Sequence, residues 1–100
     1  MIEVDEYVLG TLMRDLTGHD RQPSAFLVYL TLWRLAQAGS GWSVQASLRE
    51  VADATGLSRR AVQSALARLH KRKLIGIERA GVTAVPVYTV QRPWAGRRLE

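Results

Sequence analysis

The sequence of 100 residues has no cysteine, and its two histidines, His19 and His70, are far apart. A disulfide framework and a zinc site with thiolate ligands are therefore excluded. The longest apolar stretch, residues 25–33, has nine residues, whereas a membrane-spanning helix needs about 20. The first six residues include three acids, where a signal peptide requires positive charge. We therefore expect a cytoplasmic protein that has no membrane span, no metal and no cofactor.

The composition that is present is typical of a globular domain with a single core. Apolar residues make up 47% of the chain and charged residues 23%. We expect one domain over residues 1–100, divided into an N-terminal helix with a connector (1–23), a core (24–90) and a C-terminal tail (91–100). We expect the tail to be a frayed terminus rather than a contact to nucleic acid.

Positive charge is concentrated in the second half of the chain. Residues 1–53 contain four arginines and seven acids, a net charge of −3, whereas residues 54–100 contain ten basic residues and two acids, a net charge of +8. A concentrated basic region favours a polyanionic partner, because Lys and Arg side chains that bind phosphates release condensed counterions. A solvated charged surface would have the same composition, so charge alone leaves both possibilities open.

Two helices are predicted in the first half of the chain. Apolar residues recur every four positions from Val4 to Leu16, which predicts an amphipathic helix over residues 3–16. After a polar connector, we expect Ser24 to cap a second helix that ends near Ala38. This second helix is apolar except along one narrow stripe, so neighbouring elements must cover it. We therefore expect a homodimer, in which the N-terminal helix is the expected cover, either within the chain or across the two-fold axis.

A helix, a turn and a further helix are predicted next. Residues 42–46 alternate between apolar and polar, as in a short strand. Ser47 and Glu50 have the spacing of a capping box, which predicts a helix that begins directly after Ser47. Gly56 is placed to end this helix, and Ser58 is placed to cap a third one.

The third helix has an apolar face and an opposite polar face, as judged at about 100° per residue. The side expected in the core holds Val62, Ala65, Leu66 and Leu69. The side expected in solvent holds Arg60, Gln63, Ser64, Ala67 and Lys71. Two β-rich segments follow, residues 75–79 and 85–90, and the loop between them predicts a hairpin. Because Pro86 cannot donate a ladder hydrogen bond, its strand should lie at a sheet edge or begin near this residue.

Residues 48–67 resemble the helix-turn-helix unit of bacterial regulators. The resemblance rests on Ala52, which is small where two helices cross, on Gly56 in the turn, and on Val62, which would pack back between the helices. With the hairpin, residues 24–90 resemble winged helix-turn-helix transcriptional regulators of the MarR- and GntR-like kinds. The resemblance implies a mainly α fold with a small β-hairpin wing, in which the N-terminal helix precedes a three-helix core.

The resemblance also implies that the protein binds double-stranded DNA and regulates transcription, with the third helix in the major groove. The residues expected near the bases are Ser58, Arg59, Arg60, Gln63 and Ser64. The residues expected at phosphates farther along the helix are Arg68, Lys71 and Arg72. In the wing, Arg79 and Thr83 are expected near the minor groove or the backbone.

Other interpretations are weighed beside this one. An enzyme would need converging titratable groups, and here the acids and histidines are scattered, so we expect no catalytic residues. A winged helix can also serve in protein–protein contact, and a similar unit occurs in replication proteins of plasmids and phages. Tyr29, Trp33 and Trp42 could line a pocket for a small-molecule effector, but aromatic residues in or beside an apolar helix are usually core residues.

Overall fold

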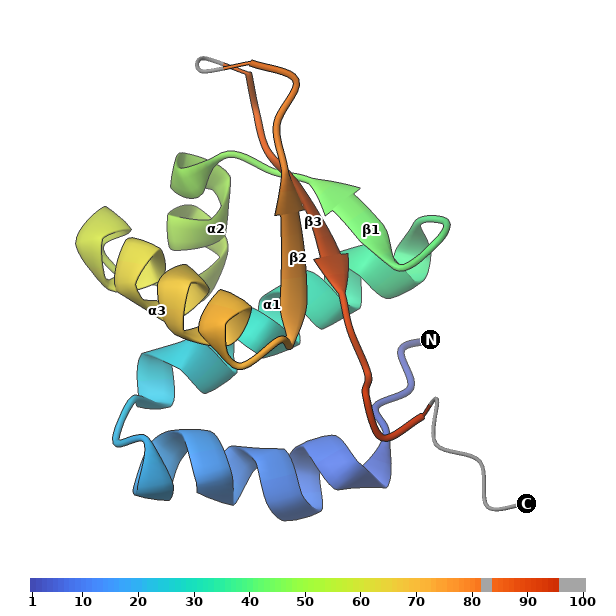
Figure 1. Ribbon diagram of the computed structural model, residues 1–100, viewed down its shortest axis with the longest axis vertical. Coiled ribbons are helices and arrows are strands. Elements are labelled where there is room, and N and C mark those ends of the chain that lie inside the picture. The colour runs from blue at the N-terminus through green and yellow to red at the C-terminus, as the bar shows by residue number, and fades with distance from the viewer. Residues whose placement is uncertain (82–83, 96–100) are drawn as a thin grey trace.

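The chain forms a helical core with a small sheet, described here for residues 1–81 and 84–95 of a computed structural model (Figure 1). The elements are, in chain order, η1 (Val8–Leu12), η2 (Asp15–His19), α1 (Pro23–Ala38), β1 (Ser43–Gln45), α2 (Leu48–Thr55), α3 (Arg59–Lys71), β2 (Ile75–Glu78) and β3 (Val87–Val90). This order confirms the predicted fold class. No helix within these described ranges is long and apolar enough to cross a membrane.

Helix α1 lies at the centre of the molecule, between the N-terminal helix and the other elements (Figure 1). Its buried residues are Ala25, Phe26, Val28, Tyr29, Leu32, Trp33 and Ala36. Tyr29 and Trp33 are 0% and 1% exposed, which confirms them as core residues. The helix begins at Pro23, whose fixed φ suits the first helical position. No side chain caps this end, so the predicted cap by Ser24 is wrong.

The N-terminal helix covers residues 6–19, with its turns mainly of the wider π type, rather than the predicted residues 3–16. Its start is later because Glu3 is held by side chains of α1. The Glu3 amide donates to Gln37 Oε1 at 3.0 Å, and the Glu3 carbonyl accepts from Trp33 Nε1 at 2.9 Å. These bonds satisfy the backbone donor and acceptor of Glu3, so Glu3 does not need to be part of the helix.

The end of the N-terminal helix is also later than predicted. Arg21 has a φ of 54°, in the left-handed region, and the Gln22 amide donates to the Leu16 carbonyl at 2.9 Å. This closing bond satisfies a carbonyl that the helix leaves unpaired. Arg21, and not a glycine, adopts the left-handed conformation at the end of the helix. Gly18 therefore lies inside the helix, and the connector covers only residues 20–22.

The N-terminal helix covers α1 within the same chain. Val8, Leu12 and Leu16 are buried in the cluster that also contains the core side chains of α1. Most of the apolar surface that led us to expect a homodimer is therefore covered without a second copy, and Leu27 of α1 remains 44% exposed. The homodimer itself stays an untested prediction.

The three strands form an antiparallel sheet in the order β1-β3-β2. Tyr88 of the central strand β3 pairs with Val44 on one side and with Ile77 on the other, and it is 2% exposed. β3 begins directly after Pro86, in agreement with the second of the two alternatives for this proline. The Pro86 carbonyl accepts from the Ala46 amide at 3.2 Å, which joins the base of the wing to the segment before α2.

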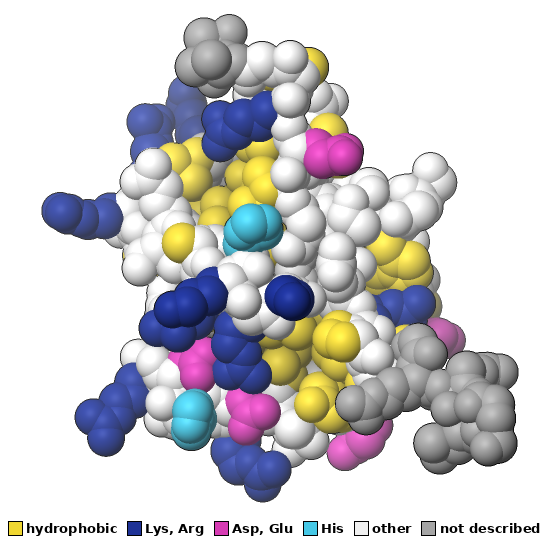
Figure 2. All heavy atoms as spheres, viewed as in Figure 1, with side chains coloured by type: hydrophobic (Ala, Val, Ile, Leu, Met, Phe, Trp, Pro, Cys, Tyr) yellow, Lys and Arg dark blue, Asp and Glu magenta, His cyan; other side chains and the backbone are white. Residues whose placement is uncertain are grey.

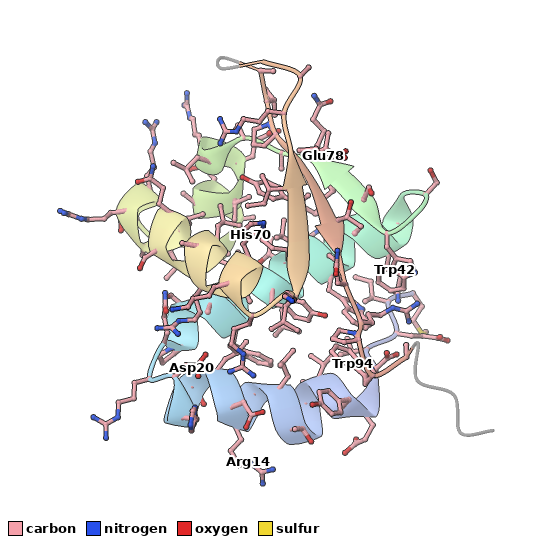
Figure 3. The ribbon with its side chains drawn as sticks, in the orientation of Figure 1. Arg14, Asp20, Trp42, His70, Glu78 and Trp94 are labelled. Atoms are coloured by element: carbon pink, nitrogen blue, oxygen red, sulfur yellow. The ribbon has the colours of Figure 1, made fainter. Side chains whose placement is uncertain are left out.

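Residues 91–95 pack against the N-terminal segment, so the predicted frayed tail is wrong for these residues. Trp94 Nε1 donates to Asp5 Oδ2 at 2.9 Å, and the Trp94 ring stacks on Tyr7 with 4.5 Å between centroids (Figure 3). Arg92 Nη1 lies 3.6 Å from the same Asp5 oxygen. The segment therefore contributes to the fold through a stacked ring pair and an ion pair.

Candidate nucleic-acid interface

Three local signals set the geometry of α2 and α3, and all three are confirmed. The Glu50 amide donates to Ser47 Oγ at 3.0 Å, and the Ser47 amide donates to Glu50 Oε1 at 2.7 Å, which completes the capping box. Gly56 has a φ of 78°, a left-handed conformation that glycine adopts without steric cost. Ser58 Oγ accepts from the Ala61 amide at 3.0 Å and so caps α3.

The two faces of α3 are as the sequence predicts. Val62, Ala65 and Leu69 are fully buried and Leu66 is 7% exposed. The residues of α3 that are exposed on the opposite side include Arg59, Arg60, Gln63, Ser64, Ala67 and Lys71. Figure 2 shows Lys and Arg side chains gathered along the border of the molecule that α3 forms in Figure 1. The second helix of the unit therefore offers a polar, cationic face to solvent.

A hollow of about 510 Å³ separates this face from the wing. Gln63 of α3 and Arg79, which follows β2, both line it, and Ile77 and Tyr88 contribute to its apolar floor (Figure 2). The structure thus brings the middle of α3 and the base of the wing to one concave surface. Thr83 lies outside the described residues, so its predicted contact to DNA stays untested.

Cations at the beginning of α3 are available to a ligand. Arg59, Arg60 and the wing residue Arg79 are exposed. Among residues 1–81 and 84–95, no carboxylate lies within 4.0 Å of their charged nitrogens. Fixed positive charge without an internal counterion attracts an anionic partner.

At the other end of α3, one of the cations forms ion pairs with acids of the same chain. Arg72 Nη1 donates to Asp20 Oδ2 at 2.9 Å, and Arg72 Nη2 lies 4.0 Å from Asp15 Oδ2. The side chain of Asp20 is only 5% exposed and that of Arg72 is 31% exposed. Arg72 is therefore held by the end of the N-terminal helix, and its predicted contact to a phosphate stays an untested prediction.

The charge of Asp20 keeps Arg72 in place. Burial acts to raise the pKa of Asp20, but hydrogen bonds from His19 and Arg72, with the charges of Arg72 and Arg68, lower it more, so the pKa lies below its usual value of 3.8. Asp20 is therefore ionised at neutral pH, and the ion pair is maintained.

One residue of this region was not singled out by the sequence. Gln22, in the connector, accepts from Arg68 Nε at 3.4 Å and donates to Ser64 Oγ at 3.4 Å. Its partners are 42 and 46 residues away in the chain, so no local pattern indicates these contacts. They become visible only once α1 and α3 are packed together.

No group of three or more potential metal ligands comes together within the described ranges. His70, the one histidine on α3, is exposed and has no hydrogen bond to another side chain of the described residues. The polar groups gathered at α3 are mainly hydrogen-bond donors. They suit the binding of an anion.

Two helices joined by a left-handed glycine turn, the second of them exposed beside a β wing, define a winged helix-turn-helix protein. A family model described as a helix-turn-helix domain matches residues 22–75, more than half of the chain, and the chain belongs to this family. No curated protein and no solved structure gives a match. Helix-turn-helix domains typically bind DNA and are not enzymes.

Proposed function

We propose that this protein binds double-stranded DNA with sequence specificity and regulates transcription, with α3 in the major groove. The observation that carries the proposal is the outer face of α3, where Arg60 and Gln63 are exposed and Arg60 has no internal counterion in the described part of the chain. Arginine can pair bidentately with guanine and glutamine with adenine, so these two side chains can distinguish base pairs.

The remaining contacts are assigned by position. Ser58, Arg59 and Ser64 lie around the first two turns of α3, where a recognition helix approaches the bases. Arg68 and Lys71 lie farther along and are assigned to phosphates. Arg79 shares the hollow with Gln63 and is assigned to the DNA backbone beside the groove.

Selection of genomic fragments by the purified protein, followed by sequencing, tests this function. We expect one enriched motif, and two inverted half-sites about 10 base pairs apart, or a multiple of that spacing, would add the homodimer to the proposal. Enrichment upstream of genes supports a regulator of the MarR- or GntR-like kind, whereas enrichment at replication origins supports a replication protein.

Two variants in the same selection serve as controls. Arg60→Ala should lose the motif, and Arg14→Ala, which removes the same charge from the N-terminal helix, should retain it. Absence of enrichment for the unmodified protein, with no DNA retained at low salt, would contradict DNA binding and favour protein contact instead.

A further inference from the structure

A polar groove of about 230 Å³ lies between α3 and the turn that precedes α1. The residues that line it are Gln22, Ser64, Ala67, Arg68 and Lys71. The lining holds two cations and no acid. Ala67 leaves space between the polar side chains, because its methyl group is the smallest side chain of the five.

The amide of Gln22 has one orientation that fits its neighbours. Arg68 can only donate hydrogen bonds, so the carbonyl oxygen of Gln22 must face Arg68 Nε, which lies at 3.4 Å. The amide nitrogen then faces Ser64 and donates to its hydroxyl oxygen at 3.4 Å. Gln22 therefore connects the two α3 side chains that lie on either side of Ala67.

This arrangement leaves unused donors directed at one groove. With Nε of Arg68 bonded to Gln22, the two terminal nitrogens of the guanidinium remain to donate to a bidentate partner such as a carboxylate or a phosphate. The Ser64 hydroxyl accepts from Gln22 and keeps its own proton to donate. Lys71 adds an ammonium group with three donors. A ligand with several acceptor oxygens and negative charge satisfies all of these groups together.

The nearest acids do not oppose such a ligand. Asp20, two residues before Gln22, has its side chain 5% exposed and is bonded by Arg72 at 2.9 Å and by His19 at 3.1 Å. Asp15 lies 4.0 Å from the same Arg72. Arg72 therefore offsets part of the negative charge beside the groove, and in the described part of the chain no carboxylate lies within 4.0 Å of the charged nitrogens of Arg68 and Lys71.

We propose that Ser64, Arg68 and Lys71 bind one backbone phosphate of the DNA duplex and that Gln22 is the positioning residue, which aligns Arg68 and Ser64 for it. For Ser64, this phosphate contact replaces the base contact assigned above by position. The proposal rests on the proposed function, because it extends the DNA surface from α3 to the connector before α1. The contact carries no base information, so it should strengthen binding to all sequences and fix where α3 sits in the groove.

Duplex affinity measured over a series of salt concentrations tests the proposal. Arg68→Ala should lower the slope of log affinity against log salt by about one, since one phosphate contact is lost. Gln22→Ala should weaken binding roughly fivefold on selected and scrambled duplexes alike, as expected for one hydrogen bond. Because Gln22 acts mainly through Arg68, the double variant should be little weaker than Arg68→Ala alone.

A charge in the groove provides a second test that does not depend on loss of packing. Gln22→Glu keeps an acceptor for Arg68 but places a carboxylate beside the phosphate, so it should weaken binding more than Gln22→Ala does. Circular dichroism should show that the variants remain folded. Arg14→Ala, which removes a charge that points away from α3 in Figure 3, should leave the salt slope unchanged.

The outcomes separate this inference from the proposed function. If Arg60→Ala weakens binding while Arg68→Ala, Gln22→Ala and Gln22→Glu all bind as the unmodified protein does, the phosphate site is wrong and DNA binding by α3 stands. If Arg60→Ala also has no effect, the proposed function is wrong. Additive losses in the double variant would show that Gln22 does not act through Arg68.

Discussion

The two ends of α3 carry similar charge but use it differently. At the beginning of the helix, Arg59 and Arg60 are exposed, with no carboxylate within 4.0 Å in the described part of the chain. At its end, Arg72 is bonded to Asp20, whose side chain is 5% exposed, and Arg68 is bonded to Gln22. The first end is available for DNA bases, whereas the second end holds the helix in place and keeps only part of its charge for a ligand.

This difference shows why a count of basic residues overestimates the DNA-binding surface. The acidic first half of the chain supplies Asp5 and Asp20, and the basic second half supplies their partners Arg92 and Arg72. Some of the basic residues of the second half are therefore paired with acids of the first half and do not add to the charge that a ligand meets. The cations that remain are those that have no carboxylate within 4.0 Å in the described part of the chain, such as Arg59, Arg60 and Arg68.

The largest expected effect comes from the buried face that both ends of α3 share. Val62→Asp places an unpaired charge at a fully buried position, at a cost of several kcal/mol, which is comparable to the whole stability of a small domain. We expect an unfolded protein by circular dichroism and loss of DNA binding. Gln63→Asp, on the exposed face next to it, is the control and should melt like the unmodified protein. A folded Val62→Asp variant would contradict the packing of α3.

A smaller effect separates the two ends directly. Arg72→Ala leaves the Asp20 side chain, which is 5% exposed, without its main cation, and we expect about 2 kcal/mol less free energy of unfolding. Arg60→Ala, at the exposed beginning of the helix, should change stability by less than about 0.5 kcal/mol. Chemical denaturation measures both values. Equal losses of stability in the two variants would remove the distinction between the ends.

Removal of the serine at the start of α3 should lower stability more than removal of the serine at the start of α1. Ser58→Ala removes the side chain that accepts from the Ala61 amide and should cost about 1 kcal/mol. Ser24→Ala removes a hydroxyl that makes no cap at the start of α1, so its melting temperature should match that of the unmodified protein. A larger loss for Ser24→Ala than for Ser58→Ala would show that α1 is capped by its serine after all.

Acid should produce the smallest effect, confined to the second end of α3. Because the pKa of Asp20 in the folded protein is lowered below 3.8, its contribution to stability is fully present above pH 3.8 and is lost as the pH falls through the folded value. Arg72→Ala removes the main partner of that carboxylate. We expect the variant to lose less stability between pH 5 and pH 2 than the unmodified protein. Acid titrations of both proteins, followed by circular dichroism, measure this difference. An equal loss of stability in the two proteins would contradict the prediction.

The sequence predicted the elements whose signals are local. The capping box at Ser47 and Glu50, the left-handed Gly56 and the cap at Ser58 each depend on residues within a few positions of one another, and the structure confirms all three. The phase of α3 was predictable for the same reason, since one helical period decides which residues are buried. These local signals were sufficient for the fold class.

The features that the sequence did not predict depend on contacts between distant residues. The N-terminal helix begins late because Glu3 bonds to α1, and the segment at Trp94 is ordered by Asp5 and Tyr7 from the opposite end of the chain. The ion pair of Arg72 depends in the same way on a distant residue, because its partner Asp20 is 52 residues away. No periodicity or short motif contains such information.

The most direct test of the central claim is the preference of the protein for a selected duplex over a scrambled one, measured in Arg60→Ala and Gln63→Ala. Each side chain can form a bidentate pair with a base that is worth about 1 to 3 kcal/mol of discrimination. We expect each variant to lose roughly 5- to 150-fold in this preference while its melting curve stays unchanged. If both variants keep the preference of the unmodified protein, α3 does not recognise DNA sequence, and the exposed face of this helix serves another purpose.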